Sequence, residues 1–241
     1  MAIDDGMPLR GQTAIVTGAG RGIGRAISRR LAAAGANVAI CSRTAEQLHE
    51  TQKCIERDNG RVLAVVADVA EEADVDRLFD ETRDVLGTPT ILVNNAGIAP
   101  VAKIEEMEPH LFDAIVRTNI RSVYLCTRAA WDDMASAGGG AVVNIASVAA
   151  FDPFPGLAAY GGAKAFVATY TKALAEEGRP LGIRVYGVAP GAVETVMLRG
   201  AFPEFPEDKV LQPDDVASLV ELLLMPGARY SSGQTITIRK E

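Results

Sequence analysis

A tyrosine and a lysine four residues apart, Tyr160 and Lys164, are the side chains of this sequence best suited to acid and base chemistry. Apolar residues at helical spacing predict a helix over 157–177, and the i, i+4 separation places both side chains on one face of it. A free phenol has a pKa of about 10, which is too high for efficient proton transfer at neutral pH. Because a nearby cation favours the phenolate, we expect Lys164 to lower the pKa of Tyr160. Many ordinary helices carry such a pair, so its role depends on the elements around it.

A glycine-rich turn follows the first predicted strand, 13–17, and precedes a helical pattern that runs from Ile23 to Leu31. The turn contains the glycines Gly18, Gly20, Gly22 and Gly24. Glycines let backbone N–H groups approach an anion closely, and the positive end of the helix favours that anion. The spacing Gly-x-x-x-Gly-x-Gly differs from the standard dinucleotide fingerprint but occupies the same place in the chain. We therefore predict that this turn holds the pyrophosphate of a dinucleotide.

The end of the second predicted strand, 37–41, indicates which dinucleotide binds. A carboxylate at this point would bind the adenosine ribose hydroxyls of NAD, but the sequence continues with Ser42 and Arg43. Without a carboxylate to repel a 2′-phosphate, and with Arg21 and Arg43 able to pair with it, the sequence favours NADP(H) over NAD(H). The alternative is that Arg43 is a solvated residue at the start of a helix.

Strands alternate with helices along the whole chain. The predicted strands are 13–17, 37–41, 61–66, 90–93, 141–146, 183–189 and 234–238. The later predicted helices are 44–57, 71–86, 108–136, 157–177 and 213–224, with a loop rich in proline and phenylalanine before the last one. This alternation predicts one α/β domain over residues 1–241, a doubly wound Rossmann-type sheet of seven parallel strands with helices on both faces. Ligands of such sheets bind beyond the carboxyl ends of the strands.

Composition limits the class of protein. The chain has 241 residues, is 48% hydrophobic and carries a net charge of −7, so no general basic surface for nucleic acid or anionic lipid is expected. No apolar run approaches the roughly 18 residues of a membrane span, and residues 1–10 do not resemble a leader, so we expect a cytoplasmic protein without a membrane partner. The three cysteines and two histidines lack the spacing of a metal site or a disulfide framework, so no metal is expected.

Six motifs, in order and over about residues 9–238, resemble the short-chain dehydrogenase/reductase family. They are Thr17 to Gly24, Asn94-Asn95-Ala96-Gly97, Asn119, Ser147, Tyr160 with Lys164, and Pro190-Gly191. The resemblance implies an oxidoreductase that transfers a hydride between a nicotinamide cofactor and a carbonyl compound or secondary alcohol. It also implies a homotetramer or homodimer that assembles through the 108–136 and 157–177 helices and the final strand.

The resemblance assigns a role to each of the four predicted catalytic residues. Tyr160 would protonate the carbonyl oxygen, and Lys164 would lower the pKa of Tyr160 and bind the nicotinamide ribose. Ser147 would hold the substrate oxygen, where an oriented hydroxyl stabilises developing charge. Asn119 would keep a water molecule against Lys164.

The resemblance also implies cofactor contacts along the whole cleft. Asp68 and Val69 would bind adenine, and Val193 and Thr195 would bind the nicotinamide carboxamide. The complete predicted cofactor set is Gly18, Arg21, Gly22, Ile23, Gly24, Ser42, Arg43, Asp68, Val69, Asn94, Ala96, Gly97, Tyr160, Lys164, Pro190, Gly191, Val193 and Thr195. The chain departs from the family pattern at 186–187 and at its end, which reads Arg239-Lys240-Glu241 in place of the usual Asp-Gly-Gly.

The segment after Thr195 is rich in apolar side chains and suits an uncharged, apolar small-molecule ketone. The apolar residues expected at the substrate are Phe151, Phe154, Met197, Leu198, Phe202 and Phe205. Arg199 is the charged exception, and we expect it either to be solvated, as a single arginine on a loop usually is, or to meet an acidic substrate. One alternative is a 3-oxoacyl-acyl-carrier-protein reductase, which needs a basic surface for its acidic partner. The flanking helices carry both acidic and basic residues: Asp132, Asp133, Glu176, Glu177, Arg117, Arg121 and Arg128. Another alternative is a catalytically silent dinucleotide-binding sensor.

Overall fold

The computed structural model describes residues 7–240, and its seven strands form one parallel sheet in the order β3-β2-β1-β4-β5-β6-β7. The strands are β1 (Thr13–Thr17), β2 (Asn37–Ser42), β3 (Val62–Val66), β4 (Ile91–Asn94), β5 (Gly140–Ile145), β6 (Ile183–Pro190) and β7 (Thr235–Ile238). The predicted doubly wound sheet is thereby confirmed, and each strand lies within one or two residues of its predicted bounds. The strand order reverses direction between β1 and β4, where a cleft opens at the carboxyl ends of such sheets.

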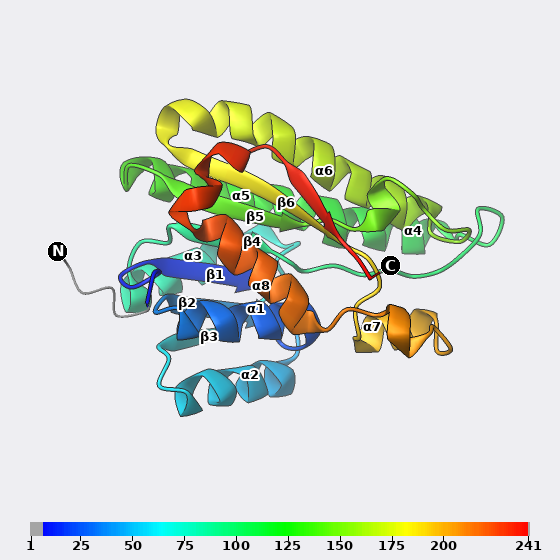
Figure 1. Cartoon of the computed structure of the whole chain (residues 1–241), viewed down its shortest axis with the longest axis horizontal. Helices are drawn as coiled ribbons and strands as arrows, with labels where there is room; N and C mark the ends of the chain where they lie inside the picture. The colour runs from blue at the N-terminus through cyan, green and yellow to red at the C-terminus, as the bar shows by residue number, and fades with distance from the viewer. Residues whose placement is uncertain (1–6, 241) are drawn as a thin grey trace.

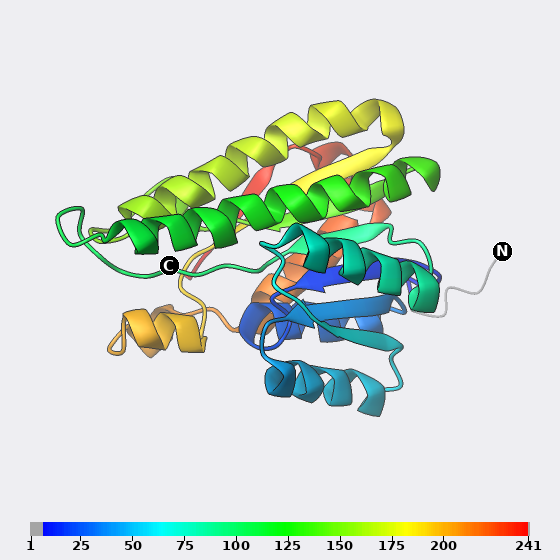
Figure 2. The same ribbon diagram turned by 180° about the vertical axis from the view of Figure 1, so that it is seen from behind.

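Helices cover both faces of the sheet (Figures 1 and 2). One face carries α1 (Gly22–Ala33), α2 (Ala45–Arg57) and α8 (Pro213–Leu224), and the other carries α3 (Glu72–Leu86), α5 (Ser122–Ser136) and α6 (Ala158–Gly178). The remaining helices are α4 (Pro109–Val116), α7 (Val196–Ala201) and short helical turns at Val148–Ala150, Arg179–Leu181, Glu207–Lys209 and Pro226–Ser231. None of the helices within residues 7–240 is long and apolar enough to cross a bilayer.

Each strand contributes to two separate cores because successive side chains point to opposite faces of a sheet. In β1, Ala14 and Val16 pack beneath α1 and α8, whereas Ile15 packs beneath α3 and α5. All three side chains are fully buried. Burial on both faces explains why these strands read as continuous apolar runs in the sequence.

Two helical segments differ from the sequence prediction. The helix predicted over 108–136 runs through α4 and α5, but a π-helical turn at Arg117–Arg121 interrupts its regular hydrogen bonding. The segment after Thr195 was predicted to be a loop, and that prediction is wrong, since it contains α7. Thr195 caps this helix, because its hydroxyl accepts a hydrogen bond from the backbone N–H of Leu198 at 3.1 Å.

Candidate active site

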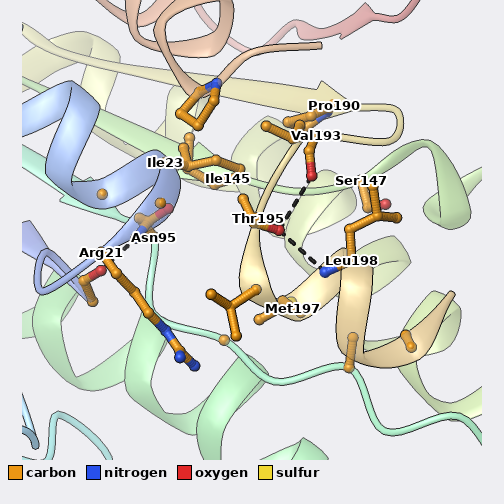
Figure 3. A pocket seen from close by; sticks show the side chains of 18 of the residues that line it. Arg21, Ile23, Asn95, Ile145, Ser147, Pro190, Val193, Thr195, Met197 and Leu198 are labelled. Atoms are coloured by element: carbon orange, nitrogen blue, oxygen red, sulfur yellow. Dashed lines mark hydrogen bonds between the residues drawn. The ribbon is translucent and has the colours of Figure 1, made fainter. Parts of the chain in front are cut away.

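A cleft of about 1470 Å³ lies across the carboxyl ends of the strands. Figure 3 looks into it, with Arg21 and Ser147 on opposite sides and Thr195 between them. Nearly all of the predicted site residues line this cleft: Gly18, Arg21, Gly22, Ile23, Gly24, Ser42, Arg43, Asp68, Val69, Ala96, Gly97, Ser147, Tyr160, Lys164, Pro190, Gly191, Val193 and Thr195. Asn94 and Asn119 do not line it. The fold therefore brings together residues that are up to about 180 positions apart in the chain.

The glycine turn between β1 and α1 leaves room for a phosphate group. Gly18 and Gly22 adopt positive φ angles of 64° and 54°, a conformation that favours glycine. A Cβ on Gly24 would lie 2.4 Å from the carbonyl oxygen of Gly18, so a side chain there would break the turn. The N-cap residue of α1, Arg21, makes no side-chain capping bond, so the first N–H groups of the helix are available to an anion in the cleft. These features fit the pyrophosphate of a dinucleotide.

The side chain that holds the glycine turn in place is Asn95, whose role the sequence did not indicate. Its amide donates to the carbonyl oxygens of Thr17 at 2.9 Å and Gly18 at 3.1 Å. The hydroxyl of Thr17 in turn accepts from the backbone N–H groups of Asn95 and Ala96, both at 3.0 Å. These bonds tie the end of β4 to the start of the turn across the switch point of the sheet.

Asn94 was predicted to line the cofactor cleft, and for its side chain that prediction is wrong. Neighbouring residues of a strand point to opposite faces, and Asn94 points into the protein, where it is 3% exposed. Its amide donates to Asn144 Oδ1 at 2.8 Å, and the Asn144 amide donates to the Thr171 hydroxyl at 2.9 Å. This chain of buried bonds joins β4, β5 and α6.

The cleft is basic beside the end of β2. Arg21 and Arg43 are exposed there, and within residues 7–240 neither forms an ion pair. Ser42 donates its hydroxyl to the carbonyl oxygen of Thr44 at 3.2 Å. On the facing side, Asp68 pairs with Arg117 at 3.0 Å, and its backbone N–H donates to Asp74 at 2.8 Å. No carboxylate stands at the end of β2, as the sequence indicates.

The catalytic candidates Ser147 and Tyr160 meet at the other end of the cleft. Ser147 lies two residues beyond the end of β5, where its hydroxyl accepts from the backbone N–H of Ala149 at 3.2 Å. Burial raises the pKa of Tyr160, and a hydrogen bond with Ser147 opposes part of that rise. The sequence predicted a lowered pKa for Tyr160, and the structure contradicts this direction. The cause is burial of the phenol in the cleft, which the spacing of Tyr160 and Lys164 does not reveal.

Lys164 lies beneath Tyr160 and is buried, with 5% of its surface exposed. Its ammonium donates to the carbonyl oxygen of Ile145, the last residue of β5, at 2.7 Å. It also lies 5.8 Å from the centre of the Tyr160 ring. Burial lowers the pKa of Lys164 to about 8, because removal from water disfavours the charged form.

Asn119 occupies the centre of the π-helical turn and is completely buried. Its side chain makes two hydrogen bonds to the backbone of Ile98, accepting from the N–H and donating to the carbonyl, both at 2.8 Å. Gly97 lies between Asn119 and the lysine: a Cβ there would be 3.1 Å from Asn119 Oδ1 and 3.6 Å from Lys164 Nζ. A π turn of this kind often marks a functional site, because it changes where a helical side chain points.

A flap lines the cleft beyond Pro190, and it consists of α7 with the residues that follow it to Lys209. Figure 1 shows α7 and this segment set apart from the sheet. Arg199 was expected to be solvated or to meet an acidic substrate. Instead its guanidinium pairs with Glu194, with Nε 2.9 Å from Oε1, and donates to the carbonyl oxygen of Phe205 at 2.6 Å. Arg199 therefore joins α7 to Glu194, which precedes the helix, and to Phe205, which follows it.

Comparison with known proteins identifies the family to which this order of motifs belongs. The short chain dehydrogenase family model matches residues 12–204. A 3-oxoacyl-[acyl-carrier-protein] reductase of Synechocystis is 35% identical over 95% of this chain and 96% of its own. The 4-formylbenzenesulfonate dehydrogenase TsaC1/TsaC2 of Comamonas testosteroni is 36% identical over 96% of this chain and 98% of its own.

A solved structure of 7α-hydroxysteroid dehydrogenase, complexed with NADH and 7-oxo glycochenodeoxycholic acid, has the same fold. It superposes with a TM-score of 0.92 at 30% identity and covers 99% of this chain and 96% of its own. Because the family model spans most of the chain and the relatives match it nearly end to end, this protein belongs to the short-chain dehydrogenase/reductase family of oxidoreductases.

Proposed function

We propose that this protein is an NADP(H)-dependent oxidoreductase that reduces an apolar small-molecule ketone or oxidises the corresponding secondary alcohol. The observation that carries the proposal is the meeting of Ser147, Tyr160 and Lys164 at one end of a cleft whose other end is a glycine turn. A carbonyl oxygen beside Ser147 and Tyr160 would have two hydroxyl donors. Residues 1–241 would act as one catalytic domain.

The residues that would hold the cofactor form a continuous surface. The glycine turn would bind the pyrophosphate. The adenosine end would be bound by Arg21, Ser42 and Arg43, and the nicotinamide by the loop from Pro190 to Thr195. Asp68 and Val69 line the cleft where the resemblance places adenine. When bound, the reduced nicotinamide supplies the hydride that carbonyl reduction needs.

The proton comes from the chain itself. Because burial raises its pKa, Tyr160 keeps its proton at neutral pH and can give it to the substrate oxygen during reduction. The phenolate formed by this transfer is stabilised by the Ser147 hydroxyl and by the positive charge of Lys164. Oxidation of an alcohol would run through the same groups in reverse. Asn119 would position solvent for reprotonation, behind Gly97.

The substrate end of the cleft is mainly apolar. Its lining includes Phe154, Leu157, Met197, Phe202 and Phe205. The Comamonas relative, 36% identical, is a dehydrogenase of 4-formylbenzenesulfonate, and the hydroxysteroid dehydrogenase, 30% identical, was solved with a 7-oxo steroid acid. An apolar carbonyl compound is therefore the substrate class that this cleft favours.

The second candidate is a 3-oxoacyl-acyl-carrier-protein reductase, the activity named for the Synechocystis relative. Such an enzyme must attract a strongly acidic partner. The arginines of the flanking helices are already engaged: Arg117 pairs with Asp68 and Glu71, Arg128 pairs with Glu72 at 2.9 Å, and Arg121 donates to the carbonyl of Ala70 at 3.1 Å. The pairing of Arg117 and Arg128 with carboxylates disfavours the carrier. A higher kcat/KM for a carrier-bound 3-oxoacyl chain than for free ketones would reverse the order.

We further propose that the protein is a homotetramer, or failing that a homodimer. β7 is an edge strand of the sheet, and its open side carries unpaired backbone groups that another chain can cover. Exposed Phe112, Tyr124 and Phe166 on α4, α5 and α6 offer a second apolar surface. Multi-angle light scattering should give a mass well above the 25.4 kDa of one chain, and a monomer at micromolar concentration would refute the proposal. The cytoplasmic location stays a prediction from the sequence.

We predict a preference for NADPH over NADH of at least about tenfold in kcat/KM, since each charge-assisted pair with the 2′-phosphate contributes about 1.5–3 kcal/mol. Steady-state kinetics with one ketone and both cofactors would measure it. Ser42→Asp combined with Arg43→Ala should reverse the preference, whereas Arg179→Ala, an exposed arginine outside the cleft, should leave it unchanged. Equal efficiency of the two cofactors in the wild type would contradict the assignment.

Tyr160→Phe should lower kcat by about 10²–10⁴-fold while NADPH binding persists, because only the transferable proton is removed. Ser147→Ala should also lower kcat with little effect on the cofactor. Single-turnover rates and the Kd for NADPH would separate the two effects. A Tyr160→Phe enzyme that kept more than about a tenth of the wild-type chemical rate would leave Tyr160 without a catalytic role. If the wild type binds NADPH but does not oxidise it with any of the ketones tested, the silent sensor is favoured.

A further inference from the structure

The end of the chain departs from the family pattern at Arg239 and Lys240, and the structure places both of these residues on the cleft. The backbone N–H of Gly191 donates to the carbonyl oxygen of Ile238 at 2.8 Å, so the end of β7 is held against the loop that follows β6. A Cβ on Gly191 would lie 2.9 Å from Cβ of Arg239. In Figure 1 the carboxyl end of the chain accordingly lies beside the segment that leads into α7.

Arg239 and Lys240 lie at the substrate end of the cleft. A second hollow adjoins the cleft, and four residues line both of them: Val148, Asp152, Arg239 and Lys240. Val148 directly follows Ser147, so the basic pair borders the region beside the reacting groups. Phe151 lines the second hollow and Phe154 the cleft, which places apolar surface near the two cations.

The charge of the cleft is opposite to that of the molecule. Nine basic and three acidic residues line it, although the whole chain carries 24 basic and 31 acidic residues. Several of the nine are neutralised, as Arg199 is by Glu194. Within residues 7–240, Arg239 and Lys240 are exposed and form no ion pair. Among the lining residues, Asp152 is the one carboxylate that lines both the cleft and the second hollow, as Arg239 and Lys240 do.

We propose that Arg239 and Lys240 bind an anionic group of the substrate, which is therefore an apolar carbonyl compound that carries a carboxylate or a similar anion away from its reacting carbon. This inference rests on the proposed function and replaces the uncharged substrate expected from the sequence. The guanidinium fork of Arg239 suits a two-oxygen anion, and Lys240 adds a second charge. Apolar surface from Phe154, Met197 and Phe202 would enclose the body of the molecule.

The test compares carboxylates with their neutral amides at two lengths, because the span between the reacting carbon and the anion is not fixed. The probes are 4-acetylbenzoate with 4-acetylbenzamide, and 7-oxooctanoate with 7-oxooctanamide. Each is assayed for NADPH oxidation and, separately, for binding to protein saturated with NADP⁺ by calorimetry. The variant is Arg239→Gln/Lys240→Gln. The matched control is Lys53→Gln/Lys172→Gln, which removes two exposed charges outside the cleft.

We expect at least one carboxylate to bind the wild type about tenfold more tightly than its amide, with a preference that weakens as salt increases. The Arg239→Gln/Lys240→Gln variant should lose that preference and the control should keep it. Carboxylates that bind no better than their amides at both lengths would overturn the inference. So would a variant that weakens carboxylates and amides alike, since that result indicates a structural role.

The two readouts separate this inference from the proposed function. If the wild type turns over neither carboxylates nor amides but still binds a carboxylate in preference to its amide, the proposed reduction fails and the anion site stands. If amides are reduced and no carboxylate is preferred in binding or in kcat/KM, the reduction stands and the anion site fails.

Discussion

The burial of one positive charge, the ammonium of Lys164, constrains the geometry of the whole catalytic end. A buried ammonium costs several kcal/mol unless polar groups surround it. The structure supplies the carbonyl oxygen of Ile145 at 2.7 Å, the ring of Tyr160 and, across Gly97, the carboxamide of Asn119. These neighbours come from β5, α6 and the π-helical turn. The three elements must therefore keep fixed positions for Lys164 to stay charged at neutral pH.

Two hydrogen-bond systems hold the two ends of the cleft, and they begin at adjacent residues, Asn94 at the end of β4 and Asn95 directly after it. Asn95 faces the cleft and ties the glycine turn to the end of β4. Asn94 faces the core and joins β4 to β5 and α6 through Asn144 and Thr171. The glycine turn and α6 are thus both hydrogen-bonded to the same end of β4. This common attachment explains how the glycine turn and Tyr160, at opposite ends of a long cleft, keep their separation.

Much of this arrangement could be predicted from the sequence because it follows from local periodicity. The strands, the glycine turn and the i, i+4 pair of Tyr160 and Lys164 each follow from spacing alone. Other features depend on three-dimensional packing. Which of Asn94 and Asn95 points into the cleft depends on the direction of each side chain where β4 ends. The π turn inserts a residue into the helix without any side-chain signal. The raised pKa of Tyr160 depends on burial in the folded protein, and the role of Arg199 depends on how α7 and the turn after it bring Glu194 and Phe205 to its guanidinium.

The most direct test of the account is the pH dependence of kcat/KM for the ketone at saturating NADPH, which reports ionisations of the enzyme–NADPH complex that binds the ketone. Lys164 is protonated below its pKa of about 8 and loses its charge above it, whereas the raised pKa of Tyr160 keeps the phenol protonated through this range. Loss of the charge would remove the proposed stabilisation of the phenolate and the proposed contact with the nicotinamide ribose. We expect a level profile at neutral pH and a fall of up to roughly tenfold per pH unit above about 8. A rate that rises between about pH 7 and 9, or stays level through about pH 10, would contradict the central role of the buried lysine.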